Sequence, residues 1–170
     1  MEFKKLAKKR YSCRDLKSEK IDQDIINTII ETAIAAPTAV NRQAFKIFIL
    51  DSEQAKKNIK EVTKWTFGAE TFLLVAYKEE DAWTRKYDNH NFAEIDASIV
   101  ATHIMLQIED LRLGTTWVSH FDAPKLKELY PEMRDYELIA IFPVSYPKDD
   151  AKPSDRHFQR KSKEELVERL

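Results

Sequence analysis

The chain has 170 residues, of which 43% are hydrophobic and 34% are charged, and its formal net charge is −1 at pH 7. This length suits one domain spanning residues 1–170, and the composition excludes disordered and fibrous proteins. A nearly neutral chain has no general attraction for nucleic acid or an anionic membrane, so any anion site must be built from a few arranged cations.

Rare residues exclude several kinds of site. Gly68 and Gly114 are the only glycines, which excludes a dinucleotide fingerprint or a P-loop. Cys13 is the only cysteine, so an internal disulfide is excluded, and the four scattered histidines predict no metal site. The basic start lacks the apolar stretch of a secretory signal and no run reaches the ~20 apolar residues of a membrane span, so a cytoplasmic location is expected.

The N-terminal part of the chain predicts two helices and a strand. Residues 2–9 form a short basic pattern typical of a helix. Asp22 is expected to cap a second helix with isoleucines at helical spacing, which Pro37 ends. Residues 44–50 are β-branched and aromatic, which indicates a strand.

The next part predicts a helix, a buried strand and a variable connection. Asp51 and Gln54 form a capping-box pattern that would open a helix. Residues 71–77 are almost continuously apolar, as in a strand covered on both faces. Residues 78–91 indicate a surface loop or short helix over a pocket. Its two aromatic side chains would stack over a substrate or cap the core: Trp83 and Tyr87.

Residues 92–113 predict a long helix with apolar side chains around most of its circumference. We expect it to be central in the domain and also buried against a second subunit, with His103 as a core or interface histidine. Gly114 would stop this helix.

The C-terminal part predicts two strands and two helices. The strands are expected at residues 115–119 and 138–144, with a short helix at residues 124–130 between them. Ser162 and Glu165 form a capping box that would open a last helix over residues 162–169, after a basic segment.

Two segments have the composition of a binding site. In the first, Arg10 and Arg14 bracket Ser12, and arginine forks with a hydroxyl suit a phosphate group. The alternative is a solvated basic surface, and Cys13 between the arginines is expected to be unreactive. The second segment, residues 36–45, is a turn rich in amide and hydroxyl groups that could read the edge of a planar heterocycle such as flavin. A plain structural turn is its alternative.

Together the two segments resemble the nitroreductase superfamily. The resemblance lies in Arg10-x-Ser12-x-Arg14 followed by Ala-Pro-Thr-x-x-Asn-x-Gln, in the long apolar helix ending at Leu113-Gly114, and in a Tyr146-Pro147 turn. It implies an α+β three-layer sandwich with a central four- or five-stranded, mainly antiparallel sheet, and a long buried helix at the interface of a homodimer. It also implies FMN at the subunit interface, bound by these residues: Arg10, Tyr11, Ser12, Arg14, Pro37, Thr38, Ala39, Asn41, Gln43, Trp117, Val118, Ser119, His120 and Arg160.

The activity that the resemblance implies is electron transfer from NADH or NADPH to a small acceptor, such as a nitro compound or a quinone, by a ping-pong mechanism. The flavin would carry the chemistry, so no protein side chain is assigned as a catalytic acid or base. A non-catalytic flavin-binding sensor or carrier on the same fold is the alternative. A small interaction domain without flavin is a third interpretation.

Overall fold

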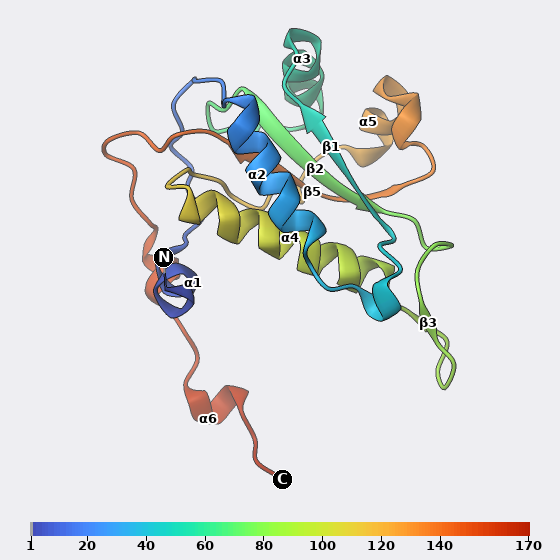
Figure 1. Cartoon of the computed structure of the whole chain (residues 1–170). Coiled ribbons are helices and arrows are strands. Elements are labelled where there is room, and N and C mark those ends of the chain that lie inside the picture. The colour runs from blue at the N-terminus through green and yellow to red at the C-terminus, as the bar shows by residue number, and fades with distance from the viewer. Residues whose placement is uncertain (1) are drawn as a thin grey trace.

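The computed structural model describes residues 2–170, and its centre is a three-stranded antiparallel sheet in the order β1-β2-β5 (Figure 1). The central strand β2 (Thr71–Tyr77) pairs with β1 (Phe45–Leu50) on one side and with β5 (Glu137–Val144) on the other. Every residue of β2 is buried. A strand with neighbours on both edges and helices over both faces is expected to be apolar throughout.

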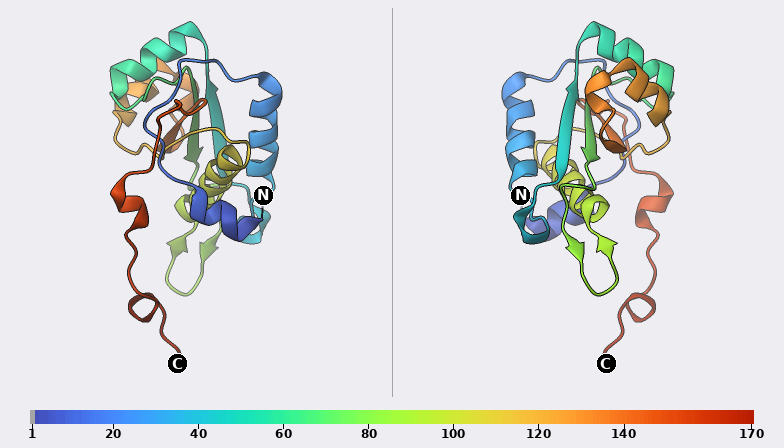
Figure 2. Two further views of the ribbon diagram at one scale, coloured as in Figure 1. Left: turned by 90° about the vertical axis from the view of Figure 1, so that its left-hand side faces the viewer. Right: turned by 90° about the vertical axis from the view of Figure 1, so that its right-hand side faces the viewer.

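Helices cover both faces of the sheet and make a three-layer sandwich (Figure 2). On one face α4 (Ala93–Asp110) packs on the strands, and α2 (Gln23–Ile34) packs beside α4. On the other face α3 (Glu53–Val62) and α5 (Ala123–Leu129) enclose a second apolar core. The α+β sandwich expected from the sequence is confirmed.

The remaining elements lie around this body, and the C-terminal tail extends away from it (Figures 1 and 2). No helix within residues 2–170 has the length and apolar character needed to cross a membrane. The short elements are α1 (Phe3–Lys9), the 3-10 turns η1 (Ala39–Asn41), η2 (Pro131–Met133) and η3 (Asp155–Phe158), the hairpin strands β3 (Thr84–Arg85) and β4 (His90–Asn91), and α6 (Lys163–Leu166).

The predicted helices and strands of the first half agree with the structure within a few residues, with two differences. The predicted capping box at Asp51 is wrong. Ser52 is the N-cap of α3, and its Oγ accepts a hydrogen bond from the Ala55 amide at 3.1 Å. Asp51 forms an ion pair with Lys20 instead. The connection at residues 78–91 is a short hairpin rather than a plain loop or helix.

The long helix α4 ends earlier than predicted and is less enclosed. It stops at Asp110, and Arg112, rather than Gly114, adopts the left-handed conformation after it, with φ of 61°. One face of α4 is fully buried on the sheet. The opposite face is only half-buried and leaves Ile95 41% exposed, so this chain alone does not enclose the helix.

The strand predicted at residues 115–119 is reduced to two isolated bridges, Gly114 with Ser145 and Val118 with Ile141, so the sheet has three strands rather than four or five. Between the bridges the Thr115 carbonyl accepts a hydrogen bond from the Cys13 amide, which interrupts any ladder. The capping box of Ser162 and Glu165 is confirmed. Its helix covers Lys163–Leu166 rather than residues 162–169, because every residue there is exposed and no packing supports a longer helix.

Candidate functional site

The arginine segment is held at the end of α1, beside the last turn of α4. Arg10 caps α1, and its amide donates to the Leu6 carbonyl at 2.9 Å. Lys9 Nζ lies 3.0 Å from Glu109 Oε1 of α4. The Cys13 amide donates to the Thr115 carbonyl at 2.9 Å, so this segment is fixed to the body on two sides.

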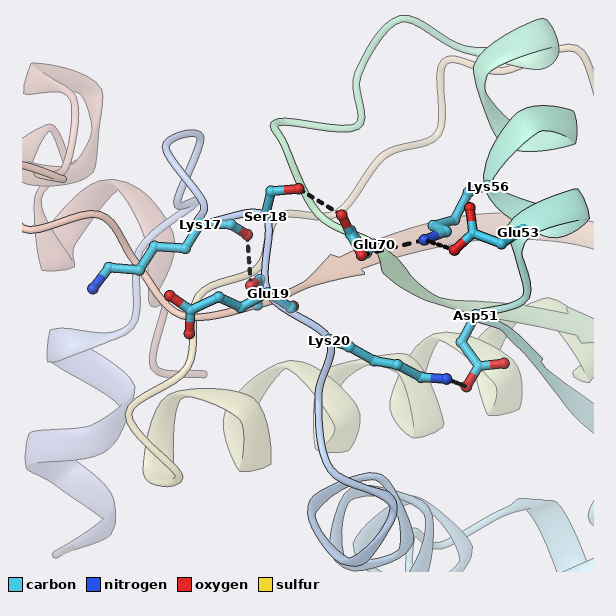
Figure 3. A network of polar contacts seen from close by, with 9 residues as sticks. Lys17, Ser18, Glu19, Lys20, Asp51, Glu53, Lys56 and Glu70 are labelled. Atoms are coloured by element: carbon cyan, nitrogen blue, oxygen red, sulfur yellow. Dashed lines mark hydrogen bonds and ion pairs between the residues drawn. The ribbon is translucent and has the colours of Figure 1, made fainter.

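A polar network fastens the chain immediately after this segment (Figure 3). Ser18 Oγ donates to Glu70 Oε1 at 2.6 Å, and Lys56 Nζ lies 3.2 Å from Glu70 Oε2. The Ser18 hydrogen bond, followed by that of Lys56, lowers the pKa of the Glu70 carboxyl. The network therefore joins the chain at Ser18 to α3 and to Glu70, the residue before β2.

The arginines and the start of the C-terminal tail enclose a pocket of about 210 Å³, here called the basic pocket. The tail approaches through η3, where the His157 ring meets the Tyr11 ring edge-on at 6.4 Å between centroids. Among the described residues no carboxylate lines this pocket. Its lining is Arg10, Tyr11, Ser12, Arg14, Ser154, Arg156, His157 and Arg160.

The electrostatics of the basic pocket favour an anion. Burial, and to a lesser degree the nearby Arg160, lowers the pKa of Arg10, although Glu109 opposes this shift. The pKa of Tyr11 is raised, first by burial and then by its hydrogen bond with Cys13, so its hydroxyl stays protonated. Four guanidinium groups with two serine hydroxyls fit the charge and geometry of a phosphate group.

A second pocket of about 500 Å³, here called the aromatic pocket, lies next to the first. The rings of Trp65 and Phe67 stack there, with centroids 5.9 Å apart and planes 28° apart. Trp117 Nε1 donates to Ser119 Oγ at 2.7 Å, and Ser119 Oγ donates to the Ile139 carbonyl at 3.3 Å, which fixes this part of the lining to β5. The lining is Arg14, Trp65, Phe67, Thr116, Trp117, Val118, Ser119 and His120.

Arg14 lines both pockets and therefore joins them. Its side chain is exposed, and Nη1 donates to the Ser12 carbonyl at 3.3 Å. A cluster of cations opening into a pocket with aromatic walls suits a molecule that has a phosphate at one end and a planar ring at the other.

The amide-rich loop at residues 37–43 does not join these pockets within one chain. The Ala39 amide donates to Asp96 Oδ1 at 2.9 Å, which ties the loop to the first turn of α4. The arginine segment is tied to Glu109, 13 residues further along the helix, or roughly 20 Å at about 1.5 Å per residue. The loop and α1 therefore lie at opposite ends of α4 (Figure 1). This group comprises Pro37, Thr38, Ala39, Asn41 and Gln43.

Sequence reasoning missed several lining residues. Trp65 and Phe67 come from the connection between α3 and β2, and only their aromatic spacing before a buried strand hinted at a pocket wall. For the tail, the two arginines of the basic segment, Arg156 and Arg160, were a usable signal. The residues without a local signal are Thr116, Ser154 and His157.

The chain matches the family model described as the nitroreductase family over residues 7–71 and 63–146. Among solved structures it is similar to a nitroreductase family protein from Clostridium difficile, with 30% identity, a TM-score of 0.90, and coverage of 99% of this chain and 98% of that chain. A nitroreductase-type protein from Exiguobacterium sibiricum, solved in complex with FMN, shares the fold at 17% identity with a TM-score of 0.85, covering 100% of this chain and 98% of that one.

A curated relative from Staphylococcus aureus is named NADPH-dependent oxidoreductase and is 26% identical over 156 residues. The match covers 82% of this chain but only 60% of the relative. The chain therefore spans about three fifths of the length of the curated proteins that it matches.

Proposed function

We propose, from the premise that this chain belongs to the nitroreductase family, that it is an FMN-dependent oxidoreductase passing electrons from a reduced nicotinamide nucleotide to a small acceptor. The observation that carries the proposal is the position of Arg14, which lines both the basic pocket and the aromatic pocket. The FMN complex of the Exiguobacterium protein, which has the same fold, supports the choice of cofactor.

The basic pocket is the proposed phosphate site. Arg10, Arg14 and Arg160 would bind the phosphate oxygens with charge-assisted hydrogen bonds, and Ser12 would add a hydroxyl. Such a site replaces the glycine-rich loops that this chain lacks.

The aromatic pocket is the proposed ring site. FMN, when bound, would supply the two-electron chemistry that takes a hydride from the donor and reduces the acceptor. The protein would orient the ring against the segment from Trp117 to His120 and hold Arg14 near its edge. Fixed donors of this kind stabilise negative charge on a bound ring without reorganisation.

We propose that the active form is a homodimer, because each chain leaves surfaces that need a cover. The outer face of α4 includes Ile95, which is 41% exposed, and the tail exposes Phe158 at 71% and Leu166 at 65%. A symmetric dimer through α4 would bring the amide-rich loop of one copy to the pockets of the other. The site would then contain Asn41 and Gln43 of the second chain.

The donor and the acceptor would use the same open face of the ring in turn, which is a ping-pong scheme. The name of the S. aureus relative supports NADPH as the first donor to test, and NADH as the second. A nitro compound or a quinone is the proposed acceptor class. We take residues 1–170 as one FMN-binding domain and propose a cytoplasmic location.

The proposal is tested by absorbance spectroscopy of the purified protein after incubation with FMN and gel filtration, followed by anaerobic addition of NADPH or NADH. We expect retained yellow flavin that is bleached by the nicotinamide and restored by an acceptor. Retained flavin that stays oxidised with both donors would favour a flavin carrier or sensor. A colourless protein would reject FMN as the cofactor.

A further inference from the structure

The amide-rich loop is strained, although it carries no glycine. Val40, Asn41 and Gln43 have φ values of 45°, 57° and 52°, in the left-handed region that side chains rarely adopt. For a β-branched residue such as Val40 this conformation is a clear outlier. Strain of this kind persists only where the surroundings hold it, and it concentrates at functional sites.

The loop presents its side chains outward rather than packing them. Val40 is 68% exposed, and Asn41 and Gln43 are also exposed. Inside the loop, Thr38 Oγ1 accepts a hydrogen bond from the Gln43 amide at 3.1 Å. A backbone hydrogen bond from the Asn41 amide to the Thr38 carbonyl also closes the turn. Gln43 Nε2 donates to the Asn41 carbonyl at 3.4 Å, while the exposed Asn41 side chain can contact another molecule.

A single buried carboxylate anchors this loop to the body. Asp96 is only 2% exposed, and its Oδ1 accepts a hydrogen bond from the Ala39 amide at 2.9 Å. Its other oxygen, Oδ2, is buried without a hydrogen-bond partner among residues 2–170. A buried carboxylate with spare acceptor capacity is costly to keep, so a role in packing alone does not explain it.

We propose that Asp96 is a positioning residue that holds the strained loop of one chain in the shape needed to complete the FMN site of a second chain. The inference rests on the proposed function and deepens it, because it assigns a residue that need not touch the flavin. Asp96 belongs to the first turn of α4, whose last turn carries Glu109 beside the arginine segment. One rigid helix would therefore carry a part of each of two sites, the loop for the site of the second chain and the arginine segment for the site of its own chain.

The first measurement is amide hydrogen exchange of the FMN-free protein, which tests the anchor independently of cofactor binding. In Asp96→Ala the Ala39 amide loses its acceptor, so we expect faster exchange across residues 38–43. Asp96→Asn keeps an oxygen acceptor and should remain close to the unmodified protein. The control is Val100→Ala on the same helix, which opens a cavity in the core but leaves the loop alone.

The second measurement is FMN affinity of the same variants by fluorescence titration. We expect about tenfold weaker binding for Asp96→Ala, near-normal binding for Asp96→Asn, and near-normal binding for Val100→Ala despite its lower Tm. Unchanged Ala39 exchange and unchanged affinity in Asp96→Ala would overturn the inference, as would equal losses in Val100→Ala. Failure of the unmodified protein to bind FMN would reject the proposed function, while the exchange result would still decide whether Asp96 holds the loop.

Discussion

At the scale of single residues, Arg14 is the arginine that lines both pockets, and its substitution should weaken cofactor binding. Its side chain is exposed and lines both pockets, so Arg14→Ala should leave the fold intact. Losing a charge-assisted hydrogen bond worth about 1.5–3 kcal/mol should weaken FMN binding about 10- to 100-fold. Arg14→Lys should recover part of the affinity, because lysine keeps the charge but not the planar fork.

Fluorescence titration with FMN measures this effect. The matched control is Arg134→Ala, since Arg134 is also an exposed arginine but lines neither pocket. Equal FMN affinities of the Arg14 and Arg134 variants would show that Arg14 does not bind FMN.

Gly114 is required by close packing rather than by backbone conformation. A Cβ at this position would lie 2.6 Å from Leu16 Cδ2 and 3.0 Å from Cys13 Sγ, both buried beside the arginine segment. We expect Gly114→Ala to lower the free energy of unfolding by about 1–3 kcal/mol, as overpacked cores do. Thermal or urea unfolding measures the change.

The same contact predicts a coupling between Gly114 and Leu16. Leu16→Val removes the Cδ2 atom that the new methyl group would meet. The double variant should therefore be more stable than the sum of the two single changes allows. Strict additivity would show that the clash is relieved in another way.

The arginine motif could be predicted at this scale because its members are local in the sequence. Arg10, Ser12 and Arg14 span five positions, and their residue types alone suggest a phosphate. Trp65 and Phe67 gave no comparable signal, because the path of the chain between α3 and β2 decides where they lie. The position of Gly114 after an apolar pattern predicts a helix stop, although its role is set by neighbours about a hundred positions away.

At the scale of elements, the long apolar patterns were sufficient to predict β2, α2 and α4, since each has a face that only the core can cover. The strand expected at residues 115–119 failed for a tertiary reason. The Thr115 carbonyl accepts a hydrogen bond from the Cys13 amide, so it is not free for a β-ladder. The residue types of this segment favour a strand, but its tertiary contacts prevent a continuous ladder.

The network that fastens the chain after Arg14 predicts that stability depends on pH. Hydrogen bonds from Ser18 and Lys56 lower the pKa of Glu70 in the folded protein. A lowered carboxyl pKa contributes stability that is fully present above the unfolded value of about 4.3 and is lost as the pH falls through the folded value. The Tm difference between the unmodified protein and Glu70→Gln should therefore be largest near neutral pH and shrink below about pH 4.

Calorimetric scans near neutral pH and below about pH 4 measure this difference in Tm. The control is Glu168→Gln, which changes an exposed carboxylate of the tail and should alter the Tm little under either condition. A Tm difference for Glu70→Gln that does not change with pH would contradict the role of the network.

At the scale of the whole molecule, the two sequence motifs lie at opposite ends of α4. The distance between them is set by the helix, and no local pattern in the sequence could have predicted it. Both motifs would contribute to one site only if a second copy supplied the loop. The half-buried outer face of α4 and the apolar residues of the tail are consistent with such a copy.

Complementation between two defective chains tests this arrangement. Arg14→Ala removes a cation from the pockets, and Asn41→Gly removes an amide side chain from the loop while tolerating its φ of 57°. Each variant alone should retain little FMN. In a heterodimer isolated through two different affinity tags, one site would combine an intact Arg14 with an intact Asn41, and the other would carry both defects. We expect about one tightly bound FMN per heterodimer by absorbance.

The contradicting outcome is a heterodimer of the correct native mass that binds no more FMN than the two parent variants. A site contained within one chain would stay defective in every such pair, so this result would rule out a site shared between chains.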